Sequence, residues 1–271
     1  MIYKHTTVAG GTIFVTISGA GNQKSGQRGR REKPTAPEVM EMNRKYAERS
    51  LSMILNHNFG AGDLHTVLTY GGDAPDPAEA KTRINNFIRK MRRLYEKKGL
   101  VFKWVLATEY KNHRIHHHFV CTGGVSLWER QDLWPWGMLR DTPLRRDRDY
   151  RKLAAYLIKE TDKTFRLAES VGKRRYTCSR NIERPQMKRE SVSARLLLED
   201  PKPVKGYYID KESVHKGVNP FTGRIYLEYV MVSIDPRPRI SSWRRGKSVP
   251  WRVGLQEGYQ DEDRQLQLPE G

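Results

Sequence analysis

The sequence predicts an α+β fold, in which an antiparallel sheet carries helices packed on one face. Three observations support this. Residues 63–122 show the order strand, helix, strand, strand, and only "KNHR" separates the last two strands. Such a short connection predicts an antiparallel hairpin, 100–110 with 114–122. Segments with helical spacing of apolar residues precede and follow these strands.

Two helix starts are marked by capping residues. Thr35 precedes Pro37 and Glu38, and the pattern predicts a helix over residues 36–57 that ends before Gly60. Asp76 and Pro77 repeat this start for a second helix that ends at Gly99. A third helix is predicted over residues 147–163. The second helix has one apolar stripe, formed by Ile84, Phe87, Ile88, Met91, Leu94 and Tyr95.

Composition divides the chain into five segments. We expect an N-terminal segment with a flexible basic arm at 1–34, a helix at 35–62 and a core domain at 63–185. A C-terminal extension at 186–235 should contain a β-hairpin, in which "KGYYID" pairs with "RIYLEYVMVSI" through "NPFTGR". Residues 236–271 are rich in Pro, Arg, Gln and Asp, and we expect a disordered tail there.

The charge balance points to a polyanionic partner. The 271 residues include 50 Lys and Arg against 31 Asp and Glu, which gives a net charge of +19 and favours nucleic acid. No apolar run reaches the roughly 18 residues of a spanning helix, so we expect no membrane partner. The two cysteines lie outside any CxxC, which disfavours a disulfide framework and a zinc knuckle. We expect a cytoplasmic protein.

The segment "RIHHHFV" concentrates chemistry in one strand. Side chains alternate along a strand, so His116 and His118 share one face. In the predicted hairpin, Glu109 pairs with His116 and Ala107 pairs with His118. Two imidazoles and a carboxylate would then converge and form an incomplete shell for a divalent cation, with positions open to water or a phosphate oxygen.

Structural roles for these histidines stay open. We expect His113, in the loop, and His117, on the apolar face, to be structural residues. The HxH pair could be structural as well. A one-residue slip in the register would move Glu109 to the other face of the sheet.

The third helix carries a tyrosine among lysines. Lys152, Tyr156, Lys159 and Lys163 lie on the arc opposite the apolar one. A phenol with a pKa near 10 is a poor nucleophile unaided. A cation at the hairpin could polarise a phosphate, and Lys159 could stabilise the tyrosinate or the developing charge. The alternative is a solvated basic face with an amphipathic tyrosine.

These residues together resemble the HUH endonuclease superfamily, and within it the single-tyrosine rolling-circle replication initiators of bacterial plasmids, phages and integrative elements. "TVLTY" at 66–70 looks like the first motif of that family. "HHH" at 116–118, with Glu109 upstream, looks like the second, and "YLIK" at 156–159 looks like the third. "RRYTCSRNIERP" at 174–185 resembles a segment that follows the tyrosine helix in these initiators.

The resemblance implies a palm-like sheet domain that nicks an origin strand, forms a 5′-phosphotyrosine and leaves a 3′ hydroxyl as primer. Glu109, His116 and His118 would bind Mg²⁺ or Mn²⁺, Tyr156 would be the nucleophile and Lys159 its helper. Some relatives carry a second tyrosine where this chain has Glu160. The partners would be single-stranded or hairpin origin DNA, with a host helicase and polymerase in a bacterial cytoplasm, because the chain has no GxxxxGK[ST] loop.

The DNA contacts should come from basic and aromatic side chains. Three rival functions remain: a relaxase or transposase of the same superfamily, a nuclease that uses metal-bound water, and a nucleic-acid-binding protein without catalysis. The predicted contacts are Thr69, Tyr70, Lys152, Lys163, Arg174, Arg175 and Arg180, the arm residues Lys24, Arg28, Arg30 and Arg31, and the stacking candidates Trp128, Trp134, Trp136 and Tyr176.

Overall fold

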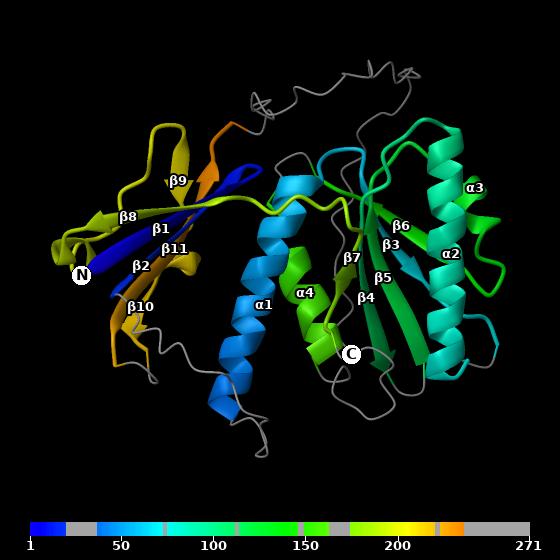
Figure 1. The fold of residues 1–271 in the computed structure, drawn as a ribbon, viewed down its shortest axis with the longest axis horizontal. Coiled ribbons are helices and arrows are strands. Elements are labelled where there is room, and N and C mark those ends of the chain that lie inside the picture. The colour runs from blue at the N-terminus through cyan, green and yellow to red at the C-terminus, as the bar shows by residue number, and fades with distance from the viewer. Residues whose placement is uncertain are drawn as a thin grey trace, which may run out of the picture. The chain divides into compact units, whose positions relative to one another are not determined.

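The structure is a computed structural model that describes residues 1–19, 37–72, 75–111, 114–145, 149–162, 174–219 and 223–235. In these residues the chain forms a five-stranded and a six-stranded sheet (Figure 1). Every strand pair in them is antiparallel. The predicted α+β class is therefore confirmed.

Helix α1 (Pro37–Asn58) begins and ends within one residue of the predicted bounds. Proline suits its first turn because that turn has no intrahelical use for the missing N–H. Arg44 bonds to Glu41 and Glu48, one turn away on either side, at 2.6 Å each. The C-terminal half of the helix buries its apolar face, which includes Leu51, Ile54 and Leu55.

The five-stranded sheet contains the predicted hairpin. Its strands lie in the order β6-β3-β5-β4-β7, so β5 lies in the centre. Side chains of β5 are therefore covered on both faces of the sheet, and His117 and His118 are both buried. The strand bounds are β3 (Leu64–Leu68), β4 (Trp104–Lys111), β5 (Arg114–Cys121), β6 (Leu139–Pro143) and β7 (Thr177–Cys178).

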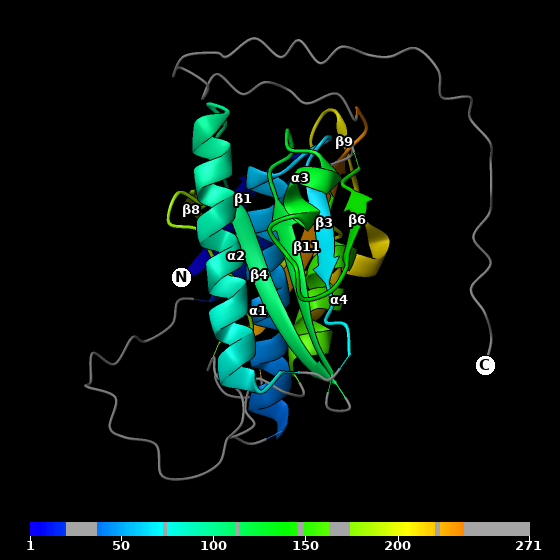
Figure 2. The same cartoon turned by 90° about the vertical axis from the view of Figure 1, so that its right-hand side faces the viewer.

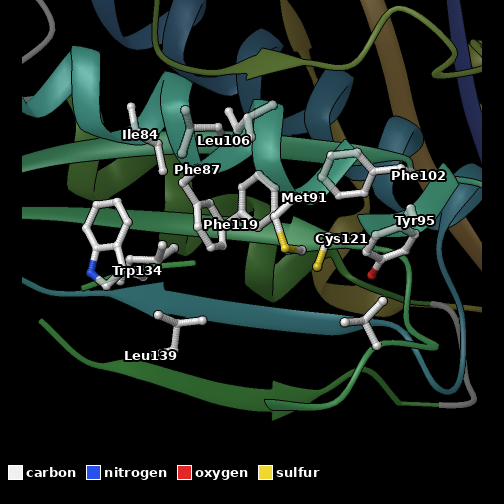
Figure 3. Close-up of a cluster of buried hydrophobic side chains, with 13 residues drawn as sticks. Ile84, Phe87, Met91, Tyr95, Phe102, Leu106, Phe119, Cys121, Trp134 and Leu139 are labelled. Carbon is white, nitrogen blue, oxygen red and sulfur yellow. The ribbon is translucent and has the colours of Figure 1, made fainter. Parts of the chain in front are cut away.

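One face of this sheet packs against α2 (Pro77–Lys97). Asp76 caps the helix by accepting the N–H groups of Ala78 and Glu79, as the sequence predicts. Strands β4 and β3 lie beside α2 when the ribbon is turned by 90° (Figure 2). Figure 3 shows the core between them, where the apolar stripe of α2 meets Leu106 and Phe119. The short helix α3 (Leu127–Gln131) follows β5.

The opposite face packs against α1 and α4 (Arg151–Asp162). Val105, Ala107 and Val120 point to this side and meet apolar residues of both helices, including Leu55 and Leu157. Figure 1 shows α2 on one side of the sheet and α1 with α4 on the other. Helical cover on one face, as predicted, is therefore incomplete. Strands β4 and β5 alternate between two apolar sets, and each set needs its own cover.

The six-stranded sheet combines the two ends of the described chain. Its main path is β10-β11-β2-β1-β8, and β9 pairs with β11. The N-terminal hairpin turns at Gly10, which has a φ of 58° that suits glycine. Strands from residues 1–34 and 186–235, which composition assigns to separate segments, thus share one sheet. The bounds are β1 (Ile2–Ala9), β2 (Thr12–Gly19), β8 (Met187–Val192), β9 (Tyr207–Ile209), β10 (His215–Val218) and β11 (Ile225–Ser233).

A C-terminal hairpin is present, as predicted, but its first strand is a different one. The strand that pairs with β11 next to "NPFTGR" is β10, with Val218 opposite Ile225. Strand β9, in "KGYYID", pairs at the far end of β11, where Ile209 lies opposite Met231. Strand β10 is hard to recognise in the sequence, because "HKGV" is short and contains glycine. Two 3₁₀ turns, η1 (Ala194–Leu197) and η2 (Lys211–Ser213), complete this region.

Helix α1 also contacts the six-stranded sheet. The guanidinium of Arg49 lies 5.3 Å from the ring centroid of Phe14 and donates to the carbonyl of Val15 at 3.2 Å. Asn56 is fully buried and donates to Thr12 Oγ1 at 2.8 Å. Its side-chain oxygen accepts the N–H of Tyr150 at 2.7 Å, directly before α4. This amide therefore fixes the start of the helix that carries Tyr156.

Candidate active site

The hairpin register places the predicted ligands on one face. Glu109 lies opposite His116, and Ala107 lies opposite His118, as predicted. Because Ala107 faces α1 and α4, the side chains of Glu109, His116 and His118 project to that same side. The one-residue slip that would separate them does not occur.

Glu109 and His118 are in contact inside the protein. His118 Nε2 lies 3.4 Å from Glu109 Oε2, and His118 and Glu109 are only 2% and 5% exposed. Burial and the neighbouring His116 lower the pKa of His118 to about 4, although the carboxylate of Glu160 opposes this shift. The imidazole is therefore neutral at pH 7 and has a lone pair to offer.

Tyr156 lies against this pair. Its ring stands nearly perpendicular to the ring of His118, with 5.3 Å between the centroids. The side chain is 43% exposed, so a substrate can reach it. Partial burial raises the pKa of the phenol, and the charges of Glu160 and Glu109 raise it further. The hydroxyl is therefore protonated at neutral pH unless positive charge is brought to it.

A divalent cation fits the chemistry of this donor set, which offers one carboxylate and two imidazoles. Glu109 and His118 already lie side by side, and His116 projects to the same face. In the described ranges, however, no three His, Cys, Asp or Glu side chains are gathered closely enough to hold a metal. A shared ligand shell would therefore require at least one of the three side chains to turn inward.

His117 points to the other face and is structural, as expected. It is 1% exposed, and its ring nitrogens lie 2.8 Å from Tyr70 Oη and 2.9 Å from Thr108 Oγ1. Tyr70, predicted to contact DNA, is thus engaged in the core. Thr69, also predicted to contact DNA, donates its hydroxyl to the carbonyl of Met138 at 3.2 Å. His113 lies outside the described residues.

The lysines of the tyrosine helix are less closely placed. Lys152 and Lys159 are exposed, and in the described part of the chain neither makes a hydrogen bond or ion pair. The charges that act on Tyr156 are carboxylates, so the predicted assistance by Lys159 stays a prediction. Lys163 lies outside the described residues, as do the arm residues Lys24, Arg28, Arg30 and Arg31.

The remaining predicted DNA contacts differ in exposure. Arg174 and Arg180 are exposed, whereas Arg175 donates to the carbonyl of Asn43 at 3.3 Å. Trp128 is 77% exposed and is available for stacking. Trp134 is fully buried and donates to the carbonyl of Thr69, so the stacking role predicted for it is wrong. Trp136 packs against Trp134, and Tyr176 Oη lies 3.4 Å from Ser50 Oγ.

A cavity of about 640 Å³ lies away from this site. Tyr95, Phe102, Trp104 and Arg180 are among its lining residues. Trp104 is five residues before Glu109 on β4, which is about 17 Å along a strand, and projects to the opposite face. The cavity therefore takes no part in the arrangement around Tyr156.

Two residues of the site were not among the predicted ones. His65, on β3, has its Nε2 3.3 Å from Nδ1 of His118. Glu160 follows Tyr156 by one helical turn, and its charge acts on both Tyr156 and His118. A signal for His65 was present, because it directly precedes "TVLTY" in a predicted strand.

Residues 63–165 match the family model of the replication-associated protein ORF2. The matched stretch runs from β3 through α4 and so contains Glu109, His116, His118 and Tyr156. The match supports a role in DNA replication for this part of the chain. No curated protein and no solved structure matches the chain. Within the described residues, no helix has the length and apolar character needed to span a membrane.

Proposed function

We propose that this chain is a replication initiator that cuts one DNA strand at an origin and becomes joined to the 5′ phosphate through Tyr156. The observation that carries the proposal is the contact of the Tyr156 ring with His118, which in turn contacts Glu109. A potential nucleophile thus lies beside a neutral imidazole and a buried carboxylate. The match to replication-associated proteins supports the same role.

The proposed reaction exchanges one phosphodiester for another. The oxygen of Tyr156 forms a bond to phosphorus while the bond from phosphorus to the 3′ oxygen breaks. The phenol gives up its proton, and the leaving 3′ oxygen takes one up and becomes the primer hydroxyl. Because the number of phosphoester bonds is unchanged, the step is reversible and allows later rejoining.

Ionisation of the phenol is the demand that the protein has to meet. Partial burial, Glu160 and Glu109 all hold the proton on Tyr156. Lys159 follows Tyr156 by three residues, a spacing that places both on one helical arc, and can offset these carboxylates. Mg²⁺ or Mn²⁺ held by Glu109, His116 and His118 would supply Lewis-acid polarisation of the scissile phosphate.

The surface of the chain suits single-stranded or hairpin origin DNA. The net charge of +19 favours a phosphate backbone, and exposed Arg174 and Arg180 are available to it. The exposed Trp128 can stack on an unpaired base. A host helicase and polymerase would then extend the 3′ hydroxyl.

The test is formation of a covalent adduct. Protein, Mn²⁺ and labelled single-stranded oligonucleotides, tiled across the replicon that carries the coding sequence, should give a product that survives a denaturing gel. Tyr156→Phe should abolish the adduct and keep DNA binding. Tyr46→Phe, which changes another exposed tyrosine, should keep both.

Other outcomes would favour the rival functions. An adduct from Tyr156→Phe would overturn the assignment of the nucleophile. Scission without an adduct would indicate hydrolysis by water, and binding without scission would indicate a non-catalytic protein. An adduct that forms only at a transfer origin or an element end would indicate a relaxase or a transposase.

A further inference from the structure

A second buried histidine touches the site. His65 Nε2 lies 3.3 Å from His118 Nδ1, and the two rings stack with 5.5 Å between centroids and 21° between planes. His65 is 9% exposed and His118 is 2% exposed. Strand β3 pairs directly with β5, so the sheet holds the two rings together.

The contact couples the tautomers of the two rings. Burial lowers the pKa of His65, like that of His118, to about 4, so both rings are neutral at pH 7. A neutral imidazole has one N–H and one lone pair. A hydrogen bond between the facing nitrogens requires an N–H on one ring and a lone pair on the other. The tautomer of one ring therefore determines the tautomer of its partner.

The surroundings of His118 decide the direction of this bond. An ionised carboxylate only accepts, so the contact with Glu109 favours the proton of His118 on Nε2. Nδ1 of His118 is then an acceptor, and His65 Nε2 is the donor. A cation held between Glu109 and His118 would need the lone pair of Nε2, and the proton of His118 would then lie on Nδ1.

We propose that His65 is the positioning residue for His118, and that the hydrogen bond between them reverses direction when a divalent cation binds. In the cation-bound state, His65 Nε2 accepts from His118 Nδ1, and His65 carries its own proton on Nδ1. Each ring has one proton before and after, with exchange through water. This inference rests on the cation site of the proposed function but does not require Tyr156 to react.

The pair gives the cation site a fixed ring orientation. An imidazole that binds a metal through one nitrogen is commonly oriented by an acceptor at its other nitrogen, and loss of such a partner weakens metal affinity by about 10- to 100-fold. Among the described histidines, His65 is placed to be that acceptor for His118. His116, which is partly exposed, makes no such contact in the described part of the chain.

The direct test reads the tautomers. Ring ¹⁵N spectra of the full chain, recorded without DNA, should show His65 and His118 both protonated on Nε2. Addition of Zn²⁺, used as a diamagnetic probe ion, should move both protons to Nδ1 together. A shift of His118 alone, or protons already on Nδ1 in both rings without the ion, would overturn the proposal.

Variants separate positioning from packing. His65→Phe keeps a ring in the stack but removes both nitrogens, and should weaken Mn²⁺ binding by about 10- to 100-fold. His65→Gln keeps a group that can donate or accept, and should restore part of that affinity. His215→Gln, at an exposed histidine of β10, should change nothing. Equal Mn²⁺ affinity in the wild type and His65→Phe would overturn the proposal even if both fold, as judged by thermal unfolding.

These readouts distinguish the two proposals. Coupled tautomers without any DNA adduct would leave the histidine pair standing and remove the nicking function. An adduct at Tyr156 with uncoupled tautomers would do the reverse.

Discussion

The ring of Tyr156 meets the ring of His118 edge to face, with 5.3 Å between centroids and 88° between planes. The helix that carries Tyr156 is held by Ala154, Leu157 and Ile158, which are all fully buried. The strand that carries His118 lies at the centre of its sheet. Core packing on both elements therefore fixes the distance between the proposed nucleophile and the proposed cation site.

Replacement of Glu109 should separate charge from shape. Glu109→Gln keeps the size of the side chain but removes the negative charge that a divalent cation needs. We expect Mn²⁺ affinity and strand scission to fall by at least about tenfold, with DNA binding unchanged. Mn²⁺ titration and a gel assay measure the two effects. Glu190→Gln, on β8, is the matched control, and equal losses in both variants would contradict the assignment.

The buried ion pair behind β3 should be important for stability. Arg130 is 2% exposed and donates to Asp141 and to Thr66 Oγ1. Arg130→Met would leave the carboxylate without its cation and should cost about 3–5 kcal/mol of unfolding free energy. Denaturant unfolding measures this. Arg195→Met removes an exposed pair with Glu199 and should cost less than about 1 kcal/mol.

The same pair predicts a loss of stability in acid. Burial alone would raise the pKa of Asp141, but hydrogen bonds from Arg130 and Thr66 outweigh it and leave the pKa below its usual value. A depressed pKa stabilises the fold above the unfolded value, which is about 3.9, and this contribution is lost as pH falls through the folded value. Between pH 5 and pH 3, unfolding free energy should therefore fall less steeply in Asp141→Asn than in the wild type. Parallel curves would exclude this contribution.

DNA binding should depend on salt through the exposed arginines. For single strands, each phosphate contact contributes about −0.7 to the slope of log K against log salt concentration. If Arg180 makes one such contact, Arg180→Ala should reduce the magnitude of that slope by about 0.7. Fluorescence anisotropy across a salt series measures the change. Arg195→Ala should leave the slope as it is, and an unchanged slope in Arg180→Ala would remove that residue from the interface.

The parts of the fold that depend on neighbouring residues were predictable from the sequence. Capping by Asp76 and the first-turn proline of α1 locate two helices within a residue or two. The four-residue loop and the two-residue period of strands fix Glu109 opposite His116. The composition of the candidate site followed from this register.

Long-range pairing was not predictable in the same way. Ser18 pairs with Tyr226 across more than two hundred residues, and no local pattern specifies that partner. The contact of His65 with His118 likewise depends on β3 lying beside β5. The N-terminal hairpin did have a local signal, because Gly10 and Gly11 separate two runs rich in β-branched residues. That signal was overlooked, whereas the sheet around it required the structure.

The most direct test of the proposed mechanism is to identify the residue that becomes linked to DNA. Protein incubated with Mn²⁺ and a cleaved oligonucleotide would be digested with protease and nuclease, and the nucleotide-bearing peptide sequenced by mass spectrometry. We expect a phosphodiester on Tyr156 and on no other tyrosine. A nucleotide attached elsewhere, or complete scission with no modified peptide, would contradict the mechanism.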